Sequence, residues 1–365
     1  MSNNKNEIAE RVAVGGEDSD EKDSGSGMKK NENEKRQVDQ IMIDKHGRTI
    51  DYLRISLTDR CNLRCIYCMP EKGVEPLAHN DILTYDEIVR ISKCAAELGI
   101  SKIKLTGGEP LVRKDCAGLA RELKAIPGIE KVTLTTNGLL LEEQLDDLLD
   151  AGIDAINVSL DTLNPELFKK IARRDGLDKV LRAIEASLTH PELSLKINSV
   201  PVIKEKQNFV ELAGLAQKYP LHVRFIEMMP IGYGKEFPFQ DEESIKAVLE
   251  EAYGMMEPVK ERYGNGPCHY YKISGFKGKI GFISAMTHKF CHQCNRIRLT
   301  AEGFMKGCLQ YQDGTDLRSL MRGGCSDEEL KEAIYQVIWK KPISHNFYEA
   351  QTSHDEIRSM SQIGG

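Results

Sequence analysis

Three cysteines stand close together in one segment of the chain, Cys61, Cys65 and Cys68, with the spacing C-x3-C-x2-C. Three thiolates on a short loop suit three corners of a [4Fe–4S] cluster. No fourth cysteine follows closely in the sequence, so one iron of such a cluster would stay open to bind another molecule. The alternative is a zinc site that a distant residue completes, although zinc sites more often show paired C-x2-C halves. The spacing therefore favours an iron–sulfur cluster.

A second group, Cys291, Cys294 and Cys308, has the spacing C-x2-C-x13-C. From spacing alone, this group fits a second cluster and a structural zinc site equally well. The zinc site would take its fourth ligand from one of four residues: His288, His292, Cys268 and Cys325. For the four cysteines outside the two groups we predict small, buried or partly buried side chains: Cys94, Cys116, Cys268 and Cys325.

The first cysteine group directly follows a strand-like run, and more such runs alternate with helical patterns. The six runs cover residues 53–57, 102–106, 131–136, 155–160, 194–200 and 221–228. One helix is expected to begin after Thr84, where the next three residues complete a capping box, and others cover 141–150, 177–189 and 208–218. Six such units predict a parallel sheet with right-handed crossovers, whose chemistry lies after the carboxyl ends of the strands.

The strand-like runs alternate apolar and polar residues, so one face of the sheet is apolar and the other carries several cations. In one run, for example, Ile103 and Leu105 alternate with Lys104 and Thr106. A sheet covered on both faces would be almost continuously apolar, and a closed barrel would be filled with Val, Ile and Leu. The pattern predicts an incomplete (β/α)6-type barrel around a wet cavity. A two-layer sandwich with one solvated face is the alternative.

Composition limits the class of protein. The 365 residues are 40% hydrophobic and 29% charged, which is typical of a soluble globular protein. There is no apolar stretch near the roughly 18 residues of a membrane span and no signal peptide, so we expect a cytoplasmic protein without a membrane partner. The net charge of −6 argues against bulk nucleic-acid binding but allows a local cationic pocket.

The chain divides into three predicted segments. Residues 1–37 are rich in Asn, Glu, Lys, Asp, Ser and Gly, and we expect a disordered extension there. Residues 38–237 carry the six strand-like runs of the partial barrel. Residues 238–365 hold a helix near 242–251, a Gly-rich β-like stretch and a helix near 327–339, which together predict a smaller C-terminal α+β domain.

With Tyr67 directly before its last cysteine, the first group resembles the signature of the radical S-adenosylmethionine superfamily. The segment Gly107-Gly108-Glu109-Pro110 resembles the motif by which that superfamily binds the methionine amino group. The resemblance implies that the open iron chelates S-adenosylmethionine and that one electron from the cluster releases a 5′-deoxyadenosyl radical. The cofactor then supplies the difficult chemistry, and no side chain is expected to act as a catalytic acid or base.

The segments 53–62 and 291–300 both resemble the GTP 3′,8-cyclase family of molybdenum-cofactor biosynthesis, as does the terminal Gly-Gly, and the resemblance covers residues 41–365. It implies a second [4Fe–4S] cluster on Cys291, Cys294 and Cys308, whose open iron meets the guanine base. GTP would be converted to 3′,8-cyclo-7,8-dihydro-GTP, which a separate cyclic pyranopterin monophosphate synthase consumes. The resemblance also implies an electron donor and allows a homodimer.

The same resemblance assigns individual residues. Contacts to S-adenosylmethionine are expected from Tyr67, Gly108, Ser159 and Met229. Contacts to GTP are expected from Arg54, Lys104, Thr135, Lys196 and the stretch Arg296, Ile297 and Arg298. The family places the tail, Gly364 and Gly365, in the active site. Lys104 stands where the family usually has Arg, which keeps the charge but loses the bidentate guanidinium.

Two other interpretations remain at this point. A radical enzyme that modifies peptides would also carry an auxiliary cluster, but such enzymes usually have more cysteines in the C-terminal domain. A non-catalytic zinc or iron–sulfur binding module belongs to a different class, and metal analysis separates it from an enzyme with about eight irons per chain.

Overall fold

The computed structural model describes residues 42–203, 207–349 and 352–364, and these belong to one compact unit. The predicted extension, residues 1–37, lies outside the described residues. No helix in the described part of the chain combines the length and the apolar character that crossing a membrane requires.

The described strands form a single sheet in the order β12-β11-β10-β1-β2-β3-β4-β5-β6-β9-β8-β7. From β10 to β9 in this order all neighbours are parallel, and the strands beyond them at either edge are antiparallel. The strands are β1 (Tyr52–Ser56), β2 (Lys102–Thr106), β3 (Lys131–Thr136), β4 (Ala155–Ser159), β5 (Ser194–Ser199), β6 (His222–Ile226), β7 (Glu257–Val259), β8 (His269–Lys272), β9 (Ile280–Ile283), β10 (Arg296–Leu299), β11 (Phe304–Lys306) and β12 (Gly314–Asp316).

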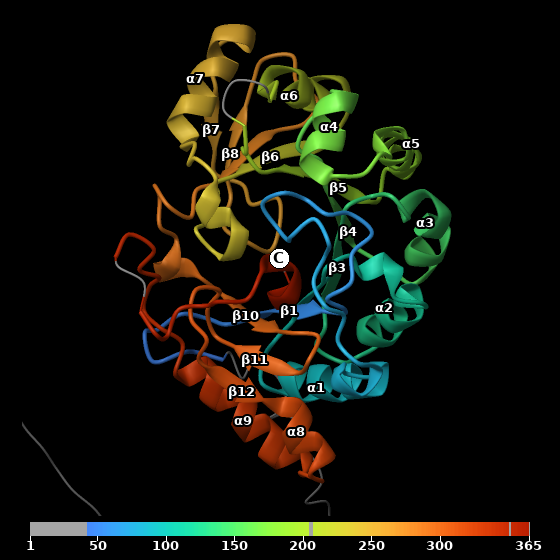
Figure 1. Ribbon diagram of the computed structural model, residues 1–365, viewed down its shortest axis with the longest axis vertical. Coiled ribbons are helices and arrows are strands. Elements are labelled where there is room, and N and C mark those ends of the chain that lie inside the picture. Colours follow the sequence, from blue (N-terminus) through green and yellow to red (C-terminus); the bar gives the residue numbers. More distant parts are fainter. Residues whose placement is uncertain (1–41, 204–206, 350–351, 365) are drawn as a thin grey trace, which may run out of the picture. The chain divides into compact units, whose positions relative to one another are not determined.

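Most helices lie outside the curved sheet, whereas the short α10 lies with the C-terminus at its centre (Figure 1). The helices are α1 (Tyr85–Glu97), α2 (Cys116–Lys124), α3 (Leu141–Asp150), α4 (Pro165–Ala172), α5 (Leu177–Leu188), α6 (Phe209–Lys218), α7 (Glu242–Tyr253), α8 (Leu317–Arg322), α9 (Asp327–Trp339) and α10 (Met360–Ile363). The sheet is not closed, because β12 and β7 are its two edges. The predicted incomplete barrel is therefore confirmed.

Alternation along the strands explains why the sheet is amphipathic. On β1, Leu53 and Ile55 are fully buried against the helices, while Arg54 faces the inside of the barrel with Lys104 beside it in register. Burial of the apolar face is the main stabilising term of such a layer, at about 25 cal/mol per Å² of apolar surface. The polar face of the sheet is left to line the cavity inside the barrel.

The helix predicted after Thr84 is confirmed, because the Thr84 hydroxyl accepts from the Glu87 amide while the Glu87 carboxylate accepts from the Thr84 amide. Helices α2 and α4 were not predicted from the sequence. Nor was a partner predicted for the segment after Cys294, which forms β10 and pairs in parallel with β1. The predicted boundary near residue 238 lies between β6 and α7, and the division into two domains stays a prediction.

Candidate active site

A cavity of about 590 Å³ opens inside the partial barrel, and both cysteine groups line it. Its wall includes all six grouped cysteines: Cys61, Cys65, Cys68, Cys291, Cys294 and Cys308. The other four cysteines are not among the described residues that line it. Two groups that are more than two hundred residues apart in the sequence thus face one space. A cavity of this size suits one nucleotide-sized ligand together with a cofactor.

The loop of the first group is held from two sides. The Gly108 amide donates to the carbonyl of Thr58 at 2.6 Å, and the Glu109 amide donates to the carbonyl of Arg60 at 2.8 Å. A side chain at Gly108 would place its Cβ 2.3 Å from the Arg60 carbonyl oxygen, so only glycine fits. The predicted Gly-Gly-Glu-Pro motif therefore packs directly against the segment that leads into Cys61.

Burial raises the pKa of the thiols in the first group, to about 11 for Cys61 and about 12 for Cys68. The Cys61 sulfur accepts from the Leu63 amide at 3.4 Å and from the Asn137 side chain at 3.7 Å. These donors suit a sulfur that carries negative charge when it binds a metal. Metal binding by such thiols releases their protons.

Two acids stand near the first group, the buried Glu109 and the half-buried Asp161. Burial raises the pKa of Glu109 to about 7, although its carboxylate accepts from the Thr136 hydroxyl at 2.7 Å and from the Asn137 amide at 2.6 Å. Burial also raises the pKa of Asp161, to about 6, and this side chain accepts from the Tyr67 hydroxyl at 2.8 Å. The Tyr67 ring is thereby fixed beside the first group.

The second group has a different electrostatic environment. Burial opposes ionisation of Cys294, but the positive charges of Arg296 and Lys341 outweigh it and lower the pKa of this thiol to about 6. Burial raises the pKa of Cys291, and the carbonyl of Cys291 accepts from Arg48 at 2.9 Å. The two groups thus share a cavity but differ in the charges around them.

A site for one metal ion needs at least three ligand atoms that converge on one point. In residues 42–203, 207–349 and 352–364, no three His, Cys, Asp or Glu side chains are arranged in that way. The four residues considered as a fourth zinc ligand, His288, His292, Cys268 and Cys325, are not among the described residues that line the cavity. Each cysteine group brings three thiols to the wall of the cavity.

Strand register brings the predicted GTP-binding side chains into rows. Arg298 on β10, Arg54 on β1 and Lys104 on β2 are direct neighbours in register. A second row runs from Thr135 through Asn157 to Lys196, and Asn157 donates to the Thr135 hydroxyl at 3.3 Å. Parallel strands in register place the same-face side chains of neighbouring strands side by side. The alternation of polar and apolar residues in the sequence and the register of the strands therefore place the same side chains on the face that lines the cavity.

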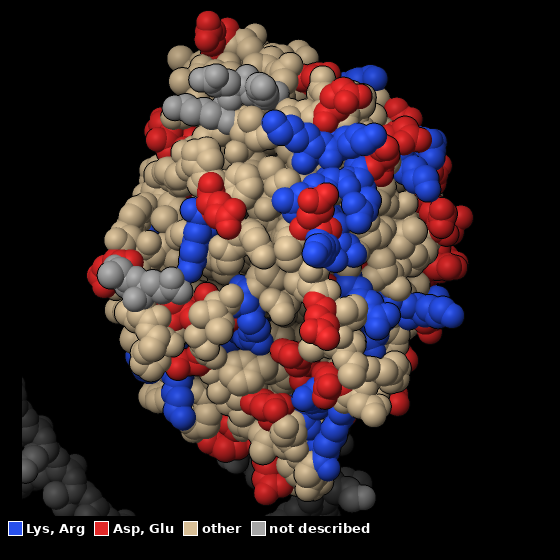
Figure 2. Space-filling view, in the orientation of Figure 1, with Lys and Arg blue, Asp and Glu red and all other residues tan. Residues whose placement is uncertain are grey.

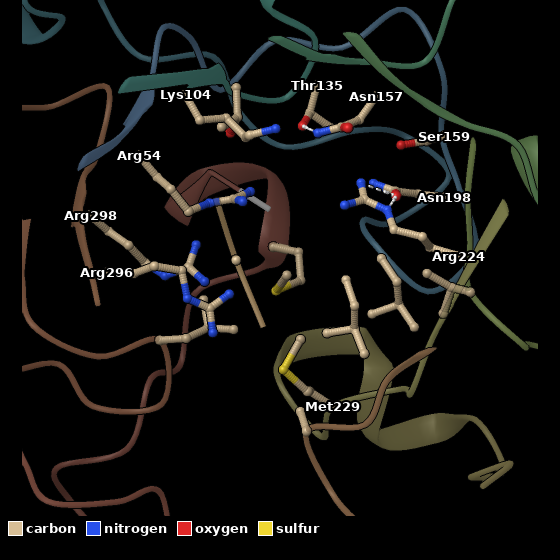
Figure 3. A pocket seen from close by; sticks show the side chains of 18 of the residues that line it. Arg54, Lys104, Thr135, Asn157, Ser159, Asn198, Arg224, Met229, Arg296 and Arg298 are labelled. Atoms are coloured by element: carbon tan, nitrogen blue, oxygen red, sulfur yellow. Dashed lines mark hydrogen bonds between the residues drawn. The ribbon is translucent and has the colours of Figure 1, made fainter. Parts of the chain in front are cut away.

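Figure 3 shows Arg54, Arg296 and Arg298 directed toward one part of the cavity, with Lys104 nearby. Burial and the neighbouring cations Arg224 and Arg54 hold the pKa of Lys104 well below its ordinary value. Burial and Arg224 likewise lower the pKa of Lys196 to about 7. These shifts have two causes, desolvation of the buried ammonium groups and repulsion from the neighbouring cations.

The charges of the cavity do not balance. Among the described lining residues, nine are Lys or Arg and four are Asp or Glu. An anionic ligand would relieve the repulsion between the cations, and each charge-assisted hydrogen bond contributes roughly 1.5–3 kcal/mol. The cavity is therefore suited to a polyanion such as a triphosphate.

The remaining predicted site residues have different positions. Tyr67, Gly108, Ser159 and Met229 all line the cavity. Ile297 does not, because its side chain lies in the hydrophobic core on the other face of β10. The Gly364 carbonyl accepts from Arg298 at 3.3 Å, and a Cβ at Gly364 would approach the Ser56 side chain to 2.7 Å. Gly365 lies outside the described residues.

The sequence analysis missed several polar residues of the cavity wall. Arg224 on β6 donates to the Asn198 side chain on β5 at 2.9 Å and 2.5 Å (Figure 3). Both residues lie within predicted strands and alternate with apolar neighbours. The same alternation that placed Lys104 on the polar face of the sheet therefore also predicts that Arg224 and Asn198 lie there. Lys341 and His345 follow α9 and carried no comparable signal.

Comparison with protein families gives two matches. Residues 55–206 match the Radical SAM superfamily, and residues 221–347 match Molybdenum Cofactor Synthesis C. The cavity receives side chains from both matched regions, with the first cysteine group in one and the second in the other.

Among curated proteins, the chain is 49% identical over 327 residues to a GTP 3′,8-cyclase of Clostridium perfringens, covering 89% of this chain and all of the relative. It is 47% identical over 329 residues to a GTP 3′,8-cyclase of Syntrophomonas wolfei, with the same coverage. Among solved structures, Streptococcus suis SuiB bound to S-adenosylmethionine aligns with a TM-score of 0.59 at 16% identity, over 85% of this chain and 70% of SuiB. At that identity, the likeness to SuiB shows the fold alone.

Proposed function

The chain belongs to the GTP 3′,8-cyclase family of radical S-adenosylmethionine enzymes, and from that premise we propose how its cavity divides the reaction between two iron–sulfur clusters. It uses S-adenosylmethionine and an iron–sulfur cluster, and it catalyses the first step of molybdenum-cofactor biosynthesis, from GTP to 3′,8-cyclo-7,8-dihydro-GTP. The observation that carries the two-cluster proposal is that both cysteine groups line one cavity whose wall carries an excess of cations.

The first cluster is held by Cys61, Cys65 and Cys68. When bound, the cluster and S-adenosylmethionine supply the radical that abstracts hydrogen from the ribose. The chain's own residues orient the cofactor: Gly108 lets its segment pack directly against the cluster loop, and Tyr67, fixed by Asp161, limits the position of the cofactor. Ser159 and Met229 complete this side of the cavity. Orientation of this kind contributes much of the rate of a radical transfer between two bound molecules.

Cys291, Cys294 and Cys308 would hold the second cluster, which would supply an iron able to bind the guanine base. Support comes from the low pKa of Cys294, about 6, because Arg296 and Lys341 favour the thiolate that a metal needs. The donors of this group therefore fit an iron–sulfur cluster. In this arrangement the first group generates the reactive species, and the second determines which carbon of the base lies within its reach.

The triphosphate lies against the cations between the two groups. We assign this role to Arg54, Lys104, Lys196, Arg296 and Arg298, with Thr135 as a neutral donor. Ile297 contributes through its backbone only, because its side chain is in the core. Lys104 serves in place of the family's usual Arg through its charge, which register places beside Arg54.

The terminal Gly-Gly acts at the same place. Arg298 contacts the Gly364 carbonyl, so the tail approaches one of the cations that would meet the triphosphate. The fully buried Ile363 packs with Ile231 and Leu309, which holds the end of the chain near the cavity.

We further propose that residues 38–237 form a cluster-bearing domain and that residues 238–365 form a second-cluster and GTP-binding domain. We also propose an external electron donor, a homodimer, and transfer of the product to cyclic pyranopterin monophosphate synthase.

Single substitutions of cysteine test the assignment of the clusters. Each variant is reconstituted anaerobically and incubated with S-adenosylmethionine, reductant and GTP, and iron, 5′-deoxyadenosine and cyclised product are measured. Cys65→Ser should give neither 5′-deoxyadenosine nor product. Cys294→Ser should bind about four irons instead of about eight and should still release 5′-deoxyadenosine slowly, without product.

Cys325→Ser is the matched control, because Cys325 is also partly buried but is not among the described lining residues. It should retain about eight irons and the normal yield of product. Zinc in place of iron at the second group, or full cyclisation by the Cys294 variant, would overturn the second-cluster proposal. Neither result would affect the assignment of the first cluster.

A further inference from the structure

Four cations stand within six residues at the carboxyl end of α4: Lys169, Lys170, Arg173 and Arg174. We call these residues the α4 basic surface. Lys169, Lys170 and Arg174 are exposed and Arg173 is half-buried. Lys169 pairs with Asp175 at 3.1 Å, but that pair is itself largely in solvent, since 59% of the Lys169 side chain is exposed. Exposed pairs of this kind contribute little to stability, so the surface is not explained as a structural element.

The α4 basic surface lies directly outside the loop of the first cysteine group. The Arg64 amide donates to the carbonyl of Ala172 at 3.0 Å, and the Ile66 amide donates to the carbonyl of Ile171 at 2.9 Å. The last turn of α4 is therefore bonded to the two residues that flank Cys65. The Arg173 guanidinium extends across the loop and donates to the carbonyl of Met69 at 3.0 Å, next to Cys68.

The α4 basic surface is positively charged, whereas the whole chain has a net charge of −6. Figure 2 shows Lys and Arg side chains gathered over the region of α4 and the neighbouring loop, with few acidic side chains among them. Residues 164–179 and the cluster-loop segment 60–78 together contain eight Lys or Arg residues and five Asp or Glu residues, so the acids offset the cations only in part. The cations are Arg60, Arg64, Lys72, Lys169, Lys170, Arg173, Arg174 and Lys179, and the acids are Glu71, Glu75, Glu166, Asp175 and Asp178. An exposed patch of one sign attracts partners of the opposite sign and speeds their association.

The reaction of this family requires electrons that its two substrates do not supply. S-adenosylmethionine, a cation, takes up one electron as its carbon–sulfur bond breaks to give methionine and the 5′-deoxyadenosyl radical. That radical takes one hydrogen atom from the ribose, and the new bond from C3′ to C8 leaves an unpaired electron on the base, which one further electron and one proton quench. Each turnover therefore oxidises an external reductant by two electrons and takes up one proton.

We propose that the α4 basic surface is the docking site for a reduced electron-carrier protein with an acidic face around its redox centre. This inference rests on the proposed first cluster, because docking at α4 brings the carrier against the loop that holds Cys61, Cys65 and Cys68. The rate of electron transfer falls steeply with distance, so the surface nearest to the cluster loop is the favourable place to dock. Charge complementarity selects an acidic protein rather than a basic one.

Two substitutions test the proposal without touching the cavity. Lys170→Glu with Arg174→Glu reverses the charge of the surface while leaving Arg173 and its contacts with the loop in place. The matched control is Lys93→Glu with Arg121→Glu, at two exposed positions of α1 and α2, which changes the net charge of the chain by the same amount. A milder variant, Lys170→Gln with Arg174→Gln, guards against a loss of folding.

The probe is a reduced ferredoxin of strongly negative net charge. Its Kd for each holoenzyme is measured by titration calorimetry at several salt concentrations, and reduction of the cluster is followed by stopped-flow absorbance without GTP. At low salt, the charge-reversed variant should bind about tenfold or more weakly, with a flatter dependence of log Kd on log salt concentration. The milder variant should lose about threefold, and the control less than twofold.

Product formation with dithionite separates this inference from the proposed function. With dithionite all four proteins should form product at rates within twofold of one another, because the cavity is unchanged. Equal ferredoxin affinity in the charge-reversed variant and the control would overturn the docking proposal. So would a loss of affinity in the charge-reversed variant only for anionic vesicles or for nucleic acid, which would assign the surface to another partner. Absence of product with dithionite in the unmodified protein would instead contradict the proposed function.

Discussion

The C-terminal tail is fastened by a buried ion pair, and breaking that pair should release the tail without unfolding the barrel. The Lys306 side chain on β11 is fully buried, and its ammonium group is bonded to the Glu356 carboxylate, which is 1% exposed. Arg358 donates to the same carboxylate at 3.0 Å and reaches Glu302 at 3.2 Å. Eight residues after Glu356, the Gly364 carbonyl meets Arg298.

The magnitude follows from the charge state of Glu356. Burial alone would raise the pKa of Glu356, but Arg358 and Lys306 outweigh it and lower this pKa from 4.5 to about 2. Taken alone, this shift corresponds to about 3 kcal/mol in favour of the docked tail. Burial lowers the pKa of Lys306 at the same time, so the net contribution of the ion pair is smaller than that. Because the folded pKa is depressed, this contribution is fully present above about pH 4.5 and is lost as the pH falls through about 2.

Lys306→Met removes one partner and leaves the carboxylate buried, a change that costs about 3–5 kcal/mol in comparable cases. The tail can leave the barrel and hydrate Glu356, so amide hydrogen exchange should quicken roughly 100- to 4,000-fold in residues 353–363 and little in β1–β6. Release of the tail should also lower the product yield, while iron content and GTP-independent cleavage of S-adenosylmethionine are retained. Lys306→Met with Glu356→Gln should cost less than the two single changes added together, because no charge is then left unpaired. Unchanged exchange in the tail, together with a lower melting temperature of the whole chain, would refute this reasoning.

Two further predictions concern the residues that meet the substrate. Removal of Gly364 and Gly365 should abolish cyclisation at unchanged iron content, which product analysis and an iron assay check; normal product yield would contradict a role for the Gly pair. Arg298→Ala should lower kcat/KM for GTP about 10- to 150-fold, since one charge-assisted contact is worth roughly 1.5–3 kcal/mol, and unchanged kinetics would move Arg298 out of the GTP site.

Local patterns in the sequence were sufficient to predict the barrel strands. The predicted runs 102–106 and 131–136 coincide with β2 and β3, because strict alternation along a strand fixes both its length and its faces. The capping box after Thr84 fixed the start of α1 in the same way. The sequence analysis overlooked α4, although Asn164 followed by Pro165 is a usual helix start and Asn164 does cap the helix.

Long-range pairing was not predictable from the sequence. Nothing in the local pattern of Arg296, Ile297 and Arg298 shows that they add a parallel strand beside β1, although that pairing sets Arg298 next to Arg54. The burial of Lys306 was equally hidden, because a lysine after Phe304 and Met305 is ordinarily expected in solvent. Such features depend on which segments meet, and a single sequence without that information indicates composition and periodicity only.

The different surroundings of the two cysteine groups give a physical reason for the proposed division of work. The acids Glu109 and Asp161 stand near the first group, whereas Arg296 and Lys341 stand near Cys294. In the proposed arrangement, the carboxylate forms of these acids would disfavour an added electron, so a cluster at the first group would be the stronger reductant, as cleavage of a sulfonium requires. The cations would lower the reducing power of a cluster at the second group and would favour an anionic ligand beside it. The two proposed clusters would therefore differ in reducing power although they share one cavity.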